Sequence, residues 1–226
     1  TSVENVDWDI INEDLFFYNK NTLDIAPSFF PQEDLFSNWS VTSNSANIDL
    51  KKKQLKLNDV DELQISDAFI LPRNGEVEIG ENFSISKLYD SEIILDTINE
   101  YHRFINASVD INSKDQFIGS GIYEYVNFNN DTFNIPFSEF KLVETFDENE
   151  QKIKTSFSSG VVDKESPILM EPGFNFFGNI ELFANNAQLL FNGKIIPSEI
   201  KNFNENRAIS YNNYFDCHYF TSPNKD

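Results

Sequence analysis

The sequence has little sulfur and no long apolar run, and each absence excludes a class of protein. One cysteine among 226 residues cannot form an internal disulfide. One Cys and two His are too few to supply the nitrogen and sulfur ligands of a structural zinc site. No apolar run is long enough to cross a bilayer, so we predict no transmembrane helix.

Positive charge is also scarce. The chain has 17 Lys and Arg against 37 Asp and Glu, a formal net charge of −20. Nucleic acids and anionic membranes recruit basic surfaces, so neither is expected as a direct partner. The simplest interpretation of the acidic excess is a well-hydrated surface, with a specific cation-binding role as the alternative.

The motifs of common enzyme classes are missing. There is no nucleophile elbow, no dinucleotide-binding glycine motif and no phosphate loop. His102 enters an expected strand between aromatic residues, which favours a structural role over a general base. Cys217 and His218 are adjacent, so on a strand their side chains would point to opposite faces. We therefore predict a protein that is not an enzyme and has no catalytic residue.

Oxygen-rich turns leave calcium open as a ligand. Three segments supply carboxylate or amide oxygens, namely 59–62, 110–112 and 129–132. None has the spacing of an EF-hand loop, and acidic clusters arise by chance in so acidic a chain. The prediction is no cofactor and no metal site, with calcium as the alternative.

Aromatic residues and short alternating segments are abundant. The chain has 23 Phe and 8 Tyr, which bury large apolar areas. Between Leu63 and Ile85, apolar and polar residues alternate in short runs separated by turn residues. We predict an all-β fold of many short strands, either a β-jellyroll or solenoid or a β-sandwich.

Glycines follow phenylalanines in a recurring pattern. Phe176-Phe177-Gly178 recurs as Phe191-Asn192-Gly193, with an apolar strand after each glycine. Each glycine is expected where the chain bends, bulges or admits another backbone closely, and Asn192-Gly193 also fits a two-residue hairpin turn. A plain hairpin and a solenoid rung both remain open. The structural or turn glycines are predicted to be Gly75, Gly119, Gly121, Gly178 and Gly193.

Composition predicts three regions. Residues 1–46 are expected to form an arm with short strands, ending in a linker-like segment. Residues 47–200 are expected to form the β-repeat domain, and the Asn-rich residues 201–226 an irregular tail. No leader-like segment begins at Thr1, so the chain is interpreted as a mature product or a fragment.

Four aromatic residues are candidates for facing a ligand such as a sugar ring. They are Trp8, Trp39, Tyr123 and Tyr125. The competing interpretation places them in the core or at its rim.

Part of the chain resembles a known repeat. Residues 177–182, followed by 187–195, resemble the repeating unit of OstA-type β-jellyroll proteins of the lipopolysaccharide-transport bridge. Residues 101–107 also resemble segments of large Bacteroidetes cell-envelope proteins of uncharacterised role. The resemblance implies a location in the periplasm or at the cell surface, a structural or conduit role, and no catalytic residues.

These observations favour a non-enzymatic, extracytoplasmic structural or interaction module of a bacterial envelope assembly. Its partners would be other envelope proteins, docked by strand addition at exposed sheet edges. The phenylalanine excess motivates a variant in which an apolar groove holds lipid acyl chains. The alternative is a carbohydrate-binding β-sandwich or a glycoside hydrolase, which would carry an aromatic cleft.

Overall fold

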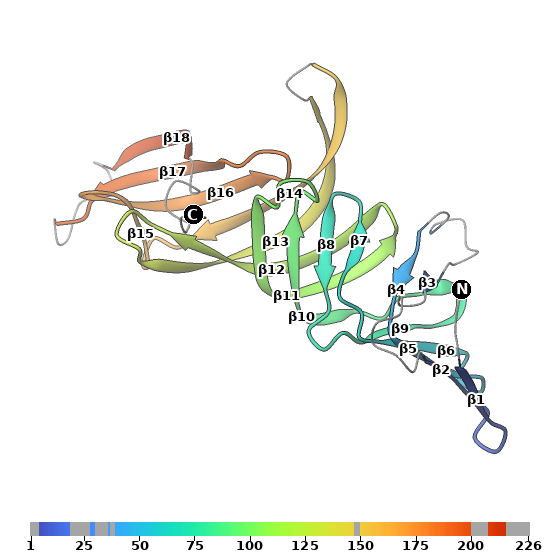
Figure 1. Cartoon of the computed structure of the whole chain (residues 1–226). Helices are drawn as coiled ribbons and strands as arrows, with labels where there is room; N and C mark the ends of the chain where they lie inside the picture. Colours follow the sequence, from blue (N-terminus) through green and yellow to red (C-terminus); the bar gives the residue numbers. More distant parts are fainter. Residues whose placement is uncertain are drawn as a thin grey trace, which may run out of the picture. The chain divides into compact units, whose positions relative to one another are not determined.

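The fold is described from a computed structural model (Figure 1). The structure describes residues 5–18, 28–29, 36, 39–146, 150–199 and 208–215. Strands account for 66% of these residues and helix for 2%, and the sheets are antiparallel. The prediction of an all-β fold is confirmed.

The chain divides into two compact units, and the first comprises residues 1–93 and 106–119. One antiparallel sheet of this unit has the order β1-β2-β5-β6-β9. Its strands are β1 (Asn5–Asp9), β2 (Asp14–Tyr18), β5 (Ser45–Asp49), β6 (Gln54–Asn58) and β9 (Val77–Ile79). A second series runs in the order β7-β8-β10-β11, with β7 (Leu63–Ile65), β8 (Ala68–Leu71), β10 (Leu88–Leu95) and β11 (His102–Ser113). The small pair β3 (Ser28–Phe29) and β4 (Val41–Thr42) and the 3-10 turn η2 (Glu81–Phe83) complete it.

The second unit comprises residues 94–105 and 120–226, so β10, β11 and β12 contribute residues to both units. Its strand order is β12-β13-β14-β16-β17-β18, and β15 also pairs with β16. The strands are β12 (Gln116–Val126), β13 (Thr132–Phe146), β14 (Lys152–Val162), β15 (Ile168–Glu171), β16 (Phe174–Phe183), β17 (Leu189–Pro197) and β18 (Ile209–Phe215). Most of them are longer than the sequence pattern indicated.

Aromatic side chains form the core of the second unit. The ring centroid of Phe104 lies 5.3 Å from that of Tyr123, 5.4 Å from Phe137 and 4.8 Å from Phe140. All four side chains are buried. Tilted and edge-to-face rings at these separations add about 0.5–1.5 kcal/mol per pair beyond the burial of apolar area. Packing in the core therefore accounts for Phe104, Phe137 and Phe140.

Gly178 and Gly193 allow β16 and β17 to approach closely. The two residues are paired directly across the strands. A Cβ atom on Gly193 would lie 2.3 Å from the carbonyl oxygen of Phe177. The hairpin turn considered for Asn192-Gly193 is wrong, because both residues lie inside β17 and pair with β16.

The remaining predicted glycines differ in role. Gly75 lies in a turn with φ +65°, and its N–H donates to the carbonyl of Pro72 at 3.1 Å. Gly119 and Gly121 lie inside β12, so the bend expected there is not formed. A Cβ atom on Gly119 would lie 2.6 Å from the carbonyl oxygen of Ser108.

Strand pairing crosses both predicted region boundaries. The boundary after residue 46 falls inside β5, which pairs with β2 of the expected arm. Part of the expected irregular tail forms β18, which pairs with β17 from Leu189 to Ile195. Short strands were expected before residue 46, but β18 was missed because its asparagines lack strand character. Cys217 and His218 lie outside the described residues.

The turn between β1 and β2 depends on an ionised carboxylate. Asp9 accepts hydrogen bonds from the backbone N–H of Asn12 at 3.1 Å, the side-chain amide of Asn12 at 2.7 Å and the N–H of Ile11 at 3.0 Å. These hydrogen bonds hold the pKa of Asp9 below its ordinary value of 3.8, and the bond from the backbone N–H of Asn12 has the largest effect.

The pKa of Asp9 sets the pH range in which this turn is stable. Because the folded pKa is the lower one, the stabilisation is present above pH 3.8 and is lost as pH falls through the folded value. A carboxyl-detected NMR titration is expected to place the Asp9 midpoint below 3.8. In the Asp9→Ala variant, the stability of the turn should no longer fall as the pH is lowered through this range. A midpoint at or above the ordinary value would contradict this account.

Candidate functional site

Three of the four predicted ligand-facing aromatics are buried, so their assignment is corrected. Tyr123 and Tyr125 point into the core of the second unit. Trp39 packs at 5.5 Å from Phe36, centroid to centroid, and its indole N–H donates to the carbonyl of Gln64 at 2.8 Å. These side chains cannot stack on a ligand.

Trp8 is the exposed member of the four, with 62% of its surface accessible. It lies on β1, near the exposed side chains of Val6, Ile10 and Ile11. It lines neither of the two depressions described below. The described side chains around Trp8 do not form a cleft in which a ring-shaped ligand could bind.

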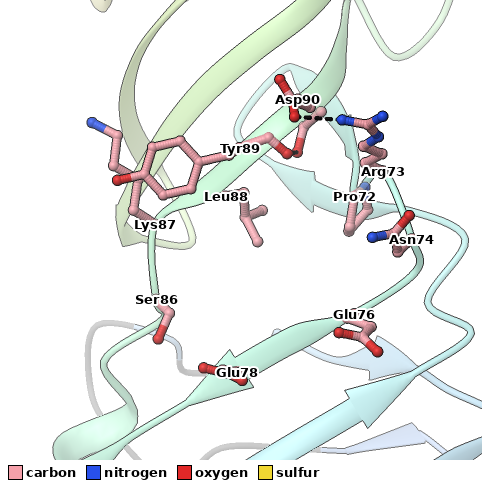
Figure 2. Close-up of a pocket in the computed structure, with 11 residues that line it drawn as sticks. Pro72, Arg73, Asn74, Glu76, Glu78, Ser86, Lys87, Leu88, Tyr89 and Asp90 are labelled. Carbon is pink, nitrogen blue, oxygen red and sulfur yellow. Dashed lines mark hydrogen bonds and ion pairs between the residues drawn. The ribbon is translucent and has the colours of Figure 1, made fainter.

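A polar depression of about 420 Å³ lies in the first unit (Figure 2). Its walls are the segment from Pro72 to Glu78, which leads from β8 into β9, and the segment from Ser86 to Ser91, which begins β10. Figure 2 shows Lys87 and Tyr89 together on one side, with Glu76 and Glu78 on the facing strand. We call this hollow the Tyr89 depression.

An irregularity in β10 exposes Tyr89. Strand side chains normally alternate between the two faces of a sheet. Asp90 has a left-handed backbone with φ +51°, and consecutive residues Tyr89 and Asp90 both face solvent while Leu88 and Ser91 are buried. Such irregularities redirect side chains beside binding sites. Sequence analysis missed Tyr89. The available signal was an aromatic residue followed by an acid, directly before the apolar run of a strand.

Ion pairs fix the charged groups of the Tyr89 depression. Arg73 contacts the carboxylate of Asp90 at 2.5 Å, and Lys87 contacts Asp110 at 2.8 Å. The hydrogen bond to Asp110 raises the pKa of Lys87 above its ordinary value of 10.5, so the ammonium stays charged at neutral pH. The carboxylates of the lining outnumber its two cations, so the depression does not favour anions.

A second depression, of about 440 Å³, lies beside the same Pro72–Gly75 turn. Asp59, Asp61 and Glu92 line it together with Arg73 and Asp90, and it includes part of one calcium candidate segment. Within the described residues, no group of three or more His, Cys, Asp or Glu side chains is placed to hold a metal ion. This acidic lining alone does not define a site.

His102 has a structural environment. Its side chain is fully buried, with Nε2 2.7 Å from the carbonyl oxygen of Asn186 and Nδ1 3.3 Å from the hydroxyl of Tyr123. A carbonyl can only accept, so Nε2 carries a proton and donates it to Asn186. In the neutral ring, Nδ1 then accepts from Tyr123. These bonds tie β11 and β12 to the segment that precedes β17.

The outer edge of β18 is the second candidate surface. β18 is the edge strand of its sheet, and β17 is its neighbour among the described strands (Figure 1). Its seven residues, Ile209 to Phe215, include no charged side chain and no proline. The side chains of Ile209 and Tyr214 are exposed. We call this surface the β18 edge.

Comparisons with protein-family models, with curated proteins and with solved structures found no match. Among the described residues, no helix has the length and apolarity needed to span a membrane. Function is therefore argued from the two surfaces themselves.

Proposed function

We propose that the protein is a non-enzymatic interaction module that binds an extended segment of a partner protein along the β18 edge. The partner segment adds a strand to the sheet, so its backbone pairs with the open side of β18. The observation that carries the proposal is a long strand edge without the charges or prolines that normally protect such edges.

The other described edge strands are protected. β1 carries Asp7 and Asp9, and charged side chains on an edge oppose pairing with another chain. β7 and β9 are three residues long, β15 is four and β3 and β4 are two, so these strands offer few backbone groups. The uncharged edge of β18 is therefore the best template for strand addition in the described part of the chain.

Charge favours a partner over a second copy of this chain. Two chains with a net charge of −20 repel each other. A segment that is uncharged where it pairs and basic at its ends would be attracted to the acidic surface and would match the neutral strand. We propose such an extended segment of another envelope protein as the occupant.

The envelope location rests on the resemblance of residues 177–182 and 187–195 to OstA-type repeats. In the structure these residues lie in β16, β17 and the connection between them, and β17 pairs with β18. The residues on which the proposed extracytoplasmic location rests therefore lie in the same part of the fold as the proposed docking edge. The lipid-holding variant has less support, because the two depressions described are lined mainly by polar side chains.

A photo-crosslinking scan tests the proposal. A benzophenone amino acid is placed in turn at each position from Ile209 to Phe215 in the native cell, with exposed Glu139 of β13 as the control position. Each side chain of β18 would lie beside the added strand on one face or the other, so crosslinks to one partner should recur along β18 and be absent at Glu139.

The matched variant replaces exposed Tyr214 with lysine, which adds a protecting charge without disturbing the core. We expect Tyr214→Lys to abolish crosslinking from Asn212 and to leave the thermal unfolding temperature unchanged. Crosslinks of equal strength at Glu139, or none along β18, would contradict strand addition.

A further inference from the structure

The Tyr89 depression combines one accessible aromatic ring with a dense set of hydrogen-bonding groups. Tyr89 is 66% exposed, whereas Leu88 and Pro72 of the same lining are buried. The remaining accessible lining consists of carboxylates, a guanidinium, an ammonium, an amide and a hydroxyl. The size, about 420 Å³, lies within the ordinary range of small-ligand sites, about 300–1,000 Å³.

This lining excludes several classes of ligand. An apolar ligand would displace water from the carboxylates of Glu76, Glu78 and Asp90, and this is costly because each keeps only the partner it already has, Lys56, Gln54 and Arg73 respectively. An anion such as a phosphate would meet these carboxylates, while Arg73 and Lys87 are already engaged in ion pairs. A second cation would compete with Lys87, whose ammonium lies 5.9 Å from the centroid of the Tyr89 ring.

We infer that the Tyr89 depression binds a neutral saccharide. A sugar ring presents an apolar face of C–H groups, which can stack on the ring of the exposed Tyr89, and hydroxyl groups around its rim. Carboxylates accept hydrogen bonds from these hydroxyls, and the guanidinium and amide groups donate to them. The ion pair between Arg73 and Asp90 holds a donor and an acceptor side by side, a spacing that suits two adjacent hydroxyls.

This inference is independent of the β18 edge, because the depression belongs to the other unit. It adds a ligand class to an interaction module and assigns no hydrolysis to the site. A protein with both surfaces would bind a glycan through one unit and a protein segment through the other.

Affinity electrophoresis of the whole chain tests the inference. Native gels contain dissolved galactomannan, xyloglucan, glucomannan or laminarin as neutral probes, and polygalacturonate as an anionic probe. At least one neutral polysaccharide is expected to retard the protein, and raising salt from about 0.05 M to about 0.5 M should leave the retardation unchanged because no net charge attraction is involved. Polygalacturonate should not retard it.

The decisive variant is Tyr89→Ala, with Trp8→Ala as its control. The two aromatics have similar exposure, 66% and 62%, and only Tyr89 lines the depression. Tyr89→Ala should weaken binding at least about tenfold, and Trp8→Ala should not change it. Thermal unfolding of both variants should match the unchanged protein, since neither side chain is buried. The inference is overturned by absence of retardation with all neutral probes, by retardation with polygalacturonate alone, or by equal binding of Tyr89→Ala.

Discussion

Replacing Gly193 with alanine is expected to lower the free energy of unfolding by about 3 kcal/mol or more. The new Cβ would lie 2.3 Å from the carbonyl oxygen of Phe177 and 2.8 Å from the Cα of Gly178. Both are backbone atoms of β16, so relief requires the two strands to separate and weakens their pairing from Phe174 to Glu181. Chemical denaturation followed by circular dichroism measures the loss.

The control is Asn192→Ala, one residue away on the exposed side of β17. It should change stability by less than about 0.5 kcal/mol. The two variants distinguish close strand approach from a turn, because at a turn the glycine is needed only for its backbone conformation. A loss of about 1 kcal/mol or less for Gly193→Ala would contradict the paired-glycine account.

Removal of the buried histidine is expected to have the second large effect. His102→Ala removes one hydrogen bond each from the carbonyl of Asn186 and the hydroxyl of Tyr123 and leaves a cavity in the core. Unsatisfied polar groups and lost packing together should cost about 3 kcal/mol, or a fall of about 6–12 °C in Tm. Differential scanning calorimetry of the whole chain measures this change.

Tyr123→Phe is the graded control for this prediction. It keeps the ring that packs on Phe104 at 5.3 Å and removes the hydroxyl that bonds Nδ1 of His102. A loss of about 1 kcal/mol is expected. If His102→Ala proved as stable as the unchanged protein, the histidine would not be a structural connection, and its assignment would have to be reconsidered.

Local alternation was sufficient to predict the class of fold. Leu63-Gln64-Ile65 and Val77-Glu78-Ile79 alternate apolar and polar residues, and the structure buries their apolar side chains in β7 and β9. Side-chain period along a strand depends on the strand alone, so a single sequence contains that information. Which strands pair depends on distant residues and is not visible locally.

The errors have identifiable physical causes. Tyr123 and Tyr125 alternate with Glu124, and a carboxylate marks the solvent face, so the tyrosines belong to the core side. Tyr89 could not be assigned from alternation, because the left-handed backbone of Asp90 shifts the pattern by one residue. β18 was missed because its asparagines lack strand character and its stability comes from pairing with β17.

Strand addition requires that the outer edge of β18 is open. Amide hydrogen exchange of the isolated full chain, resolved by NMR over residues 209–215, tests it most directly. In an antiparallel edge strand, alternate N–H groups bond the neighbouring strand and the others face away. We therefore expect slow and fast exchange to alternate along β18. Uniformly slow exchange would show that the edge is already covered and would contradict the proposed docking of a partner strand.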